Sequence, residues 1–330
     1  MKSKLVAGID VSKSSLDMSY NTSEGDVRHI KVSNDTKGFK ELMKLAGLDY
    51  LYVMECSGPY YLKLSIFLKE HHVDVSVSNG LIVKRFIQMK GERSKNDKKD
   101  SYWIHRFGME QELKLWEIPS DAQVKSKQML AGISLLKRQR TMLINQLHSF
   151  ETLHLQDKDT VKSLRSILKK IEAEIDKLER KMEDTIKDWN REQYENLLSI
   201  PGVGKRTAAL LMIQTDGFKK VDNYRQLISM VGTAPREFRS GSSVRGKVRI
   251  CKMGGKDIRS VMYLGAMSAS IYNPACKALY GRLTDKGKNG KLAMIAVVNK
   301  LLKQCYAIAK SGKKFDRELT KNFSEELLVF

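Results

Sequence analysis

The sequence lacks the features that mark secreted, disulfide-bonded and membrane-spanning proteins. Its four cysteines show no CxxC spacing, which argues against a zinc site of that type and against a disulfide framework; they are Cys56, Cys251, Cys276 and Cys305. We find no segment with the length and apolar composition of a membrane span, and the first residues lack the apolar stretch and cleavage site of a signal peptide. We therefore expect a cytoplasmic protein with no membrane partner.

Acidic residues are also scarce relative to basic ones. The 330 residues include 59 Lys and Arg against 38 Asp and Glu, which gives a formal net charge of +21. Most of this excess lies in residues 191–330. A positive excess of this size favours polyanions, because each phosphate contact releases condensed counterions. We therefore expect a nucleic-acid partner that is bound more strongly by the C-terminal part.

The first third of the chain reads as α/β structure. Short apolar runs separated by turn residues predict five strands, at 5–9, 16–20, 27–32, 51–54 and 73–77. The turn-forming residues between the second and third runs indicate that the first three strands form an antiparallel meander. A helix is predicted over 95–107. The whole length suits two or three domains, each with its own core.

Four carboxylates in this region are candidates for a metal site. Asp10 ends the first apolar run and Glu55 ends the fourth, while Asp97 and Asp100 lie three apart and would share one face of the predicted helix. Oxygen ligands of this kind hold one or two magnesium ions, which orient a phosphodiester and stabilise charge on its oxygens. The alternative for each residue alone is a solvated carboxylate, but four in this order favour a metal site.

The middle of the chain carries helical periodicity. Apolar residues recur at alternating spacings of three and four in two series, one being Met129, Ile133, Leu136, Leu143, Leu147 and Phe150, and the other Val161, Leu164, Leu168, Ile171, Ile175, Leu178 and Met182. The polar residues 156–159 between them predict a turn. The pattern predicts an antiparallel hairpin, partly coiled coil, which would serve as a rigid spacer or, through an exposed seam, as a dimerisation arm.

The third region opens with a glycine-containing turn at 197–205. We interpret it as the hairpin of a helix-hairpin-helix element, in which amides at the next helix start cradle a phosphate and basic side chains add charge. The residues concerned are Gly202, Gly204, Lys205 and Arg206. An ordinary helix connection is the alternative, and the element would give no sequence specificity.

A Ser/Gly-rich basic loop follows. Ser240, Ser242 and Ser243 lie among glycines and arginines, so an exposed hydroxyl could attack a phosphate while guanidinium groups stabilise the transition state. The alternative is a solvated linker. Candidate phosphate-binding side chains in and after this loop are Arg239, Arg245, Lys247, Arg249, Lys252 and Lys256.

These motifs together resemble one family. GIDVSK, MECSG and the ND..D cluster, followed by IPGVG and then RSG.S..G...I.K.G....R, are similar to the DEDD-type transposases of bacterial insertion sequences. That family includes Piv-type DNA invertases and recombinases guided by a bridge RNA. The resemblance covers nearly the whole chain in order.

The resemblance implies an α/β plus α architecture with three domains. These are a RuvC-like, ribonuclease-H-type domain at 1–115, a coiled-coil helical hairpin at 116–190, and a mainly helical transposase domain at 191–330 with the helix-hairpin-helix element and the serine loop. It further implies that Asp10, Glu55, Asp97 and Asp100 hold Mg²⁺, with Mn²⁺ as a substitute. Ser240 would be the nucleophile that becomes joined to DNA, although Ser242 and Ser243 lie close.

The resemblance also implies the partners. They are double-stranded DNA of the element ends and target, a noncoding bridge RNA, and further copies of the chain in a homodimer or homotetramer that pairs the acidic domain of one subunit with the serine domain of another. Two alternatives stay open from the residues alone. One is a structure-selective nuclease in which the acidic residues activate water, and the other is a non-catalytic nucleic-acid-binding protein.

Overall fold

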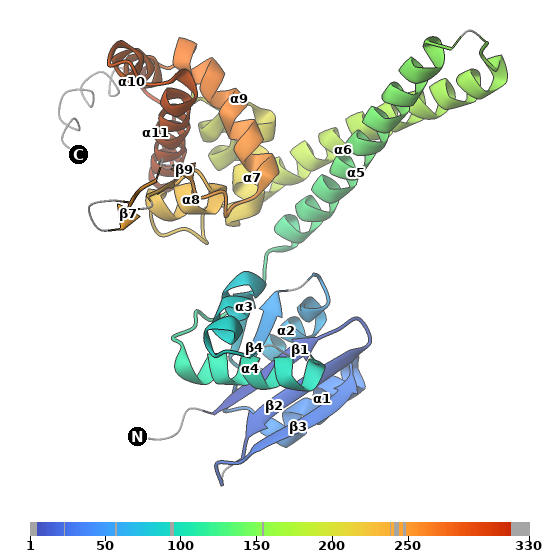
Figure 1. The fold of residues 1–330 in the computed structure, drawn as a ribbon, viewed down its shortest axis with the longest axis vertical. Helices are drawn as coiled ribbons and strands as arrows, with labels where there is room; N and C mark the ends of the chain where they lie inside the picture. Colours follow the sequence, from blue (N-terminus) through green and yellow to red (C-terminus); the bar gives the residue numbers. More distant parts are fainter. Residues whose placement is uncertain are drawn as a thin grey trace. The chain divides into compact units, whose positions relative to one another are not determined.

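The computed structural model describes residues 5–22, 24–56, 58–92, 96–153, 155–237, 239–240, 244–246 and 249–317. The chain forms two compact units, Met1–Ile118 and Pro119–Phe330, which are drawn in blue to teal and in green to red in Figure 1. We call them the first and the second unit. The division into three domains stays a prediction.

The first unit is built on a five-stranded mixed sheet in the order β3-β2-β1-β4-β5. The strands β1 (Val6–Val11), β2 (Ser15–Asn21) and β3 (Val27–Ser33) form the expected antiparallel meander. The strands β4 (Leu51–Cys56) and β5 (Val75–Asn79) continue the sheet parallel to β1. This arrangement confirms a mixed α/β N-terminal part and is consistent with a ribonuclease-H-like sheet.

The two faces of the sheet are covered by different helices. The helices α1 (Thr36–Ala46) and α2 (Tyr61–Glu70) pack with alternate strand residues such as Ile9, Met18 and Met54 in one apolar core. The helices α3 (Gly80–Met89) and α4 (Asp97–Glu110) pack on the opposite face, in a second core with Val6 and Val53. Because side chains alternate along a strand, Asp10 and Glu55 face α4 rather than α1 and α2.

Glycine lets α4 approach the sheet closely. A Cβ on Gly8 of β1 would lie 2.0 Å from the backbone nitrogen of His105, and one on Gly108 would lie 2.6 Å from Val6 Cγ1. Buried hydroxyls of Ser19 in β2 and Ser101 in α4 also hydrogen-bond across this contact at 2.8 Å. The start of α4 is therefore fixed directly over β1 and β2.

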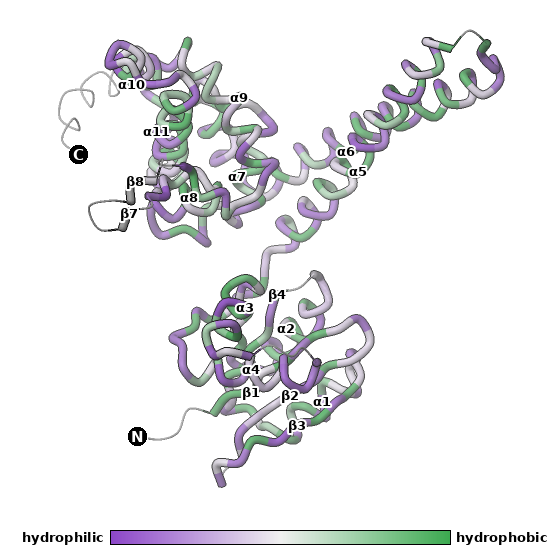
Figure 2. Tube along the Cα trace, in the orientation of Figure 1, coloured by the Kyte–Doolittle hydropathy of each residue, from purple (hydrophilic) through white to green (hydrophobic). Residues whose placement is uncertain are grey.

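The second unit begins with the expected helical hairpin. Helix α5 (Asp121–Glu151) packs against the longer α6 (Lys158–Leu198), and the alternating colours along both helices in Figure 2 reflect their periodic sequences. Ile133, Leu147 and Ile175 are buried, whereas most other seam residues are half-buried. Helix α6 begins at Lys158, where the Asp157 side chain caps it, so residues 158 and 159 of the predicted polar turn 156–159 are helical instead.

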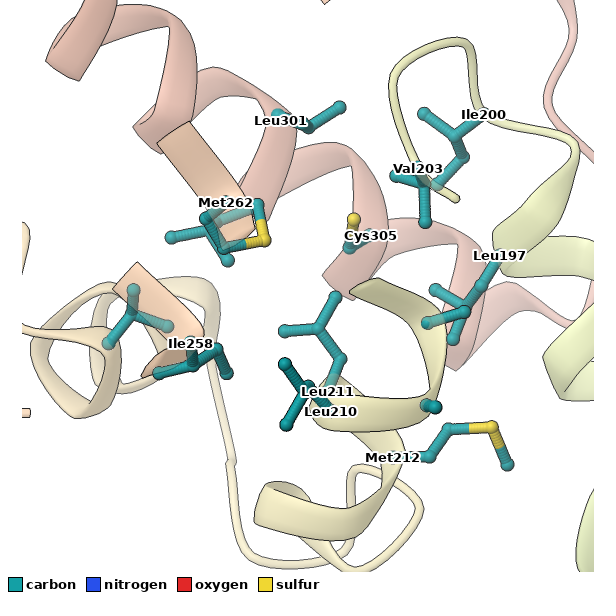
Figure 3. Packing of buried hydrophobic residues seen from close by; sticks show 14 of the residues in the cluster. Leu197, Ile200, Val203, Leu210, Leu211, Met212, Ile258, Met262, Leu301 and Cys305 are labelled. Atoms are coloured by element: carbon teal, nitrogen blue, oxygen red, sulfur yellow. The ribbon is translucent and has the colours of Figure 1, made fainter. Parts of the chain in front are cut away.

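The remainder of the second unit is mainly helical. The helices are α7 (Lys205–Thr215), α8 (Tyr224–Val231), α9 (Lys256–Tyr272), α10 (Pro274–Asp285) and α11 (Gly290–Ser311). Between α8 and α9 lie four two-residue strands, β6 (Pro235–Arg236), β7 (Arg239–Ser240), β8 (Val244–Arg245) and β9 (Arg249–Ile250). Figure 3 shows α7 and its neighbours joined by one apolar cluster that includes Leu211, Met262 and Leu301.

Helix α11 departs from one expectation. It is the one helix among the described residues that has the length and apolar composition needed to cross a membrane, although we expected no such segment. Its buried side chains, among them Val297, Val298 and Leu301, belong to the core of the second unit. A core helix of a folded domain meets the same criteria of length and composition, so the finding is weak evidence for a membrane span.

Candidate functional site

A row of polar residues crosses the sheet of the first unit on the face covered by α4. Asp10 in β1 pairs with Asp17 in β2, and Asp17 pairs with Lys31 in β3. Glu55 follows Met54 in β4 as Asp10 follows Ile9 in β1, and Ile9 and Met54 are partners in the parallel ladder. Asp10 and Glu55 are therefore neighbours at the same level of two adjacent strands.

Helix α4 brings the other two predicted carboxylates to this row. Asp97 and Asp100 lie in its first turn. The Asn96 side chain caps the helix by accepting a hydrogen bond from the Lys99 amide at 2.8 Å. The positive end of the helix dipole favours acidic side chains at this position. The cap and the contact between Ser19 and Ser101 thus fix the helix start beside the row.

The electrostatics of Asp10 reflect this convergence. The pKa of Asp10 is raised to about 6, first by burial and then by the charges of Asp100, Asp97, Glu55 and Asp17, in that order of influence. The structure therefore places the other three sequence-predicted carboxylates near enough for their charges to act on Asp10. Their roles as catalytic residues and metal ligands stay predictions.

The spacing and the chemistry of these side chains decide whether they suit a divalent cation. As they stand, no three His, Cys, Asp or Glu side chains in the described part of the chain are grouped closely enough to hold a metal ion. The groups at the site are nevertheless carboxylates, which are the hard oxygen donors that Mg²⁺ prefers. The raised pKa of Asp10 reflects burial first and then repulsion between the carboxylates, and a bound cation would relieve that repulsion. The residues therefore fit such a cation in the chemistry of their donor atoms.

Gly80 positions the Glu55 carboxylate. A Cβ at Gly80, the first residue of α3, would lie 2.5 Å from Glu55 Oε1 and 2.9 Å from its Cδ. Any larger residue at this point would push the carboxylate out of its place. The glycine is therefore part of the site's geometry, although nothing in the sequence around it indicated this.

Asp17, His29 and Lys31 also belong to the site and were missed by sequence analysis. Asp17 is only 5% exposed, and its carboxylate contacts His29 Nε2 at 3.1 Å and Lys31 Nζ at 3.2 Å. The same Lys31 ammonium lies 3.7 Å from Asp97 Oδ2. The available signal was an acidic residue inside an apolar strand, between Leu16 and Met18.

In the second unit the predicted serine loop is a narrow double hairpin. The β6 and β9 strands pair Pro235 with Ile250 and Arg236 with Arg249, and β7 pairs with β8 so that Ser240 lies opposite Val244. Ser240 thus lies at the end of this two-residue ladder that is farther from the β6 and β9 pair. Ser242 and Ser243 lie outside the described residues.

The base of this hairpin is held firmly. The Lys252 amide donates to the carbonyl of Gly232 at 3.1 Å, and the Arg259 guanidinium donates to the carbonyls of Val231 and Gly254 at 3.2 and 2.9 Å. Gly254 packs so closely that a Cβ there would lie 2.0 Å from the Met230 carbonyl oxygen. The segment carrying Ser240 therefore projects from a well-defined base.

The turn before α7 has an additional structural role. Gly202 has a φ of +100°, and a Cβ on it would lie 2.6 Å from Ala269 Cβ in α9, so the turn packs against that helix. Gly204 forms the N-terminal cap of α7 and has open space around it. Lys205 pairs with Glu183 at 3.0 Å, and Arg206 is exposed. Phosphate binding by these residues stays a prediction.

The other predicted basic contacts lie in or near the serine hairpin. Arg239 and Arg245 lie in β7 and β8, Arg249 is exposed in β9, and Lys252 and Lys256 are exposed between β9 and the start of α9. Lys247 lies outside the described residues. The site residues therefore divide between the units, with the carboxylates in the first and the serine and most predicted phosphate-binding residues in the second.

Two family models match the chain. Residues 194–281 match the model described as the transposase IS116/IS110/IS902 family, and residues 7–156 match a transposase model of the DEDD IS110 type. The first matched range contains the serine hairpin and the second contains all four predicted carboxylates. Together the two ranges include most of the chain.

Known proteins are similar over the same regions. The chain is 27% identical to the pilin gene-inverting protein of Moraxella bovis over 96% of this chain and 99% of that protein. It is 28% identical to the pilin gene-inverting protein of Moraxella lacunata, with the same coverage. The transposase for insertion sequence element IS1328 of Yersinia enterocolitica is 28% identical over 44% of this chain and 43% of its own length.

These matches confirm the resemblance drawn from the sequence motifs. The matched range with the acidic residues precedes the matched range with the serine hairpin, which is the order expected from the sequence. The protein belongs to the IS110 family of transposases and is a recombinase that cleaves and rejoins DNA.

Proposed function

We propose that the protein cuts and rejoins DNA through a covalent phosphoserine intermediate formed by Ser240. The Ser240 Oγ attacks the scissile phosphorus, the bond from phosphorus to the 3′ oxygen breaks, and the serine proton leaves as the 3′ oxygen gains one. The ester bond retains the free energy of the broken phosphodiester. Rejoining to a new 3′ hydroxyl therefore requires no ATP.

The acidic residues would act on the same phosphodiester. DEDD transposases typically use a divalent metal, and we assign Asp10, Glu55, Asp97 and Asp100 as the residues that would hold Mg²⁺, with Mn²⁺ as a substitute. When bound, such a cation orients the phosphate and stabilises charge on the departing oxygen. The observation that carries the proposal is the placement of Asp10 beside Glu55, under the first turn of α4.

The serine and the carboxylates would act on the same DNA site from different subunits. In the assembly we propose, a homodimer or homotetramer, the serine hairpin of one subunit works with the acidic site of another. Half-buried positions along the hairpin of α5 and α6 support the use of this seam in assembly. The DNA substrate would place the protein in the cytoplasm.

The choice of DNA sequence would depend largely on a guide RNA. We propose that a noncoding bridge RNA pairs with the element ends and the target, as the family resemblance implies. The basic excess and the exposed Arg206, Arg249, Lys252 and Lys256 support backbone contacts to both nucleic acids. A protein that delegates sequence reading in this way needs charge more than base-specific side chains.

DNA inversion is a specific form of this activity. Both relatives that match over nearly the whole chain are named as gene-inverting proteins, whereas the insertion-sequence transposase matches over less than half of it. A substrate with two sites in inverted orientation on one plasmid, compared with two sites on separate plasmids, would separate inversion from transposition.

The test is a Mg²⁺-dependent cleavage assay with element-end DNA and copurified RNA. A denaturing gel resolves protein covalently joined to DNA. We expect an adduct with the wild type and with Ser242→Ala and Ser243→Ala, and none with Ser240→Ala or Asp10→Asn. Cleavage that survives Ser240→Ala without any adduct would instead establish a nuclease that uses water. DNA binding without cleavage in any variant would support a non-catalytic binding protein.

A further inference from the structure

Lys31 is a cation at the rim of an otherwise acidic site. It occupies the outer end of the row that runs through Asp17 and Asp10, on the strand at the edge of the sheet. Its ammonium contacts Asp17 Oδ2 at 3.2 Å and Asp97 Oδ2 at 3.7 Å. Its side chain is 55% exposed, so the ammonium is accessible from outside the protein.

The two contacts of Lys31 differ in kind. Asp17 has a side chain that is 7% exposed and a second partner in His29, so it is a fixed anchor. Asp97 has a side chain that is 62% exposed and a longer contact. An ion pair between two exposed groups contributes little and is readily exchanged for another anion. The structure thus holds the lysine on one side and leaves it exchangeable on the other.

A phosphodiester approaching the site needs such a group. The carboxylates Asp10, Glu55, Asp97 and Asp100 repel an approaching DNA phosphate, and a positive charge at the rim of the site reduces that repulsion. An anchored ammonium at the rim can bind the phosphate beside the one that is cut. Lysine suits this role because it binds phosphate as a compact point charge.

We propose that Lys31 binds a backbone phosphate of the DNA strand that is cleaved at the acidic site, and that Asp17 is its positioning residue. In the complex Lys31 exchanges its contact with Asp97 for the phosphate, which leaves Asp97 available to a metal ion. This inference rests on the proposed function, because it assumes that the acidic site acts on DNA. It adds a substrate-binding subsite to the four carboxylates.

The test separates substrate binding from metal binding. The full-length variants are Lys31→Met, Lys31→Arg, Asp17→Asn and, as a control, Arg28→Met. Arg28 is an exposed cation on the same strand, but its side chain points to the opposite face. Affinity for a short element-end duplex is measured across a salt series with Ca²⁺ in place of Mg²⁺, and Mg²⁺ affinity is measured by calorimetry without DNA.

We expect Lys31→Met to weaken DNA binding roughly three- to tenfold and to lower the slope of log affinity against log salt by about one, as for the loss of one phosphate contact. Mg²⁺ affinity should stay the same or rise, because a competing cation is removed from Asp97. Lys31→Arg should restore most of the affinity, Asp17→Asn should weaken it in the same direction, and Arg28→Met should have a smaller effect.

Two outcomes would overturn the inference. In one, Lys31→Met leaves the affinity and salt slope at wild-type values and weakens Mg²⁺ binding, which would make Lys31 a positioning residue for Asp97 alone. In the other, Lys31→Met changes neither quantity. Failure of the proposed function looks different, because Asp10→Asn would then leave Mg²⁺ binding unchanged whatever Lys31 does.

Discussion

Replacing Gly8 by alanine would place a methyl group inside the backbone of α4. The added Cβ would lie 2.0 Å from the nitrogen and 2.5 Å from the Cα of His105. Ordinary contact begins near 3.4 Å, so helix and strand must separate by roughly 1.4 Å. Neither neighbour is a flexible side chain. The strain must therefore be relieved by moving α4 away from β1.

The magnitude follows from what this movement disrupts. Overpacking of a close contact costs about 1–3 kcal/mol. The buried hydrogen bond between Ser19 and Ser101, at 2.8 Å, would lengthen at a further cost of about 1 kcal/mol. We expect a total loss near 3 kcal/mol, which is less than the typical stability of a domain. The variant should therefore fold, with Asp97 and Asp100 displaced from Asp10.

The assay combines denaturant unfolding with calorimetric titration of Mg²⁺. Gly8→Ala should lower the unfolding free energy by about 3 kcal/mol and weaken Mg²⁺ binding at least tenfold. Gly281→Ala is the matched control: this glycine lies inside α10 with open space around it, so alanine should stabilise the protein by about 0.5–1 kcal/mol. Wild-type stability and Mg²⁺ affinity for Gly8→Ala would refute the close approach of α4 to β1.

Three further perturbations test separate parts of the site. Gly80→Ala should weaken Mg²⁺ binding about tenfold with little loss of stability, because it displaces only the Glu55 carboxylate; an unchanged titration would contradict this. Mg²⁺ affinity should fall about tenfold per pH unit below pH 6, where Asp10 binds a proton in competition with the metal, and Asp10→Asn should abolish this dependence. Burial lowers the pKa of His105 to about 4 from 6.5, so its contribution to stability is complete above pH 6.5 and is lost as the pH falls toward 4, by at most about 3 kcal/mol. Asp10 changes stability in the opposite direction, because its raised pKa makes the folded state bind a proton first as the pH falls from 6 to 3.8. The contribution of the histidine is therefore isolated by comparing denaturant unfolding of the wild type and of His105→Phe across this pH range. Equal dependence of the unfolding free energy on pH in the two proteins would exclude this effect.

The sheet and its carboxylates were accessible to sequence reasoning for a clear reason. Strands buried on one or both faces leave apolar runs, and residues 5–9 and 51–54 are such runs that end directly before Asp10 and Glu55. The hairpin of α5 and α6 was similarly visible, because a seam of alternating three and four spacing extends over many turns. These features repeat a local signal often enough to be read from one sequence.

The rest of the site depends on register and close approach, which leave no local signal. Whether Asp17 faces Asp10 or the opposite core depends on pairing between β1 and β2, and a slip of one residue would reverse it. The contact of Gly80 with Glu55 joins residues from two elements. The strands β6 to β9 have two residues each, too few to show any periodicity.

The fold holds the carboxylates of the acidic site near one another against their mutual repulsion, and this favours the binding of a cation. Packing of α4 on the sheet brings Asp97 and Asp100 toward Asp10 and Glu55, and their mutual repulsion adds to the effect of burial in raising the pKa of Asp10. The N-terminal end of the α4 dipole and the ammonium of Lys31 act against this repulsion at Asp97. The remaining repulsion destabilises the fold in the absence of a cation and is relieved when a cation binds. Weakening the packing of α4, as in Gly8→Ala, should therefore reduce metal affinity even though no ligand is removed.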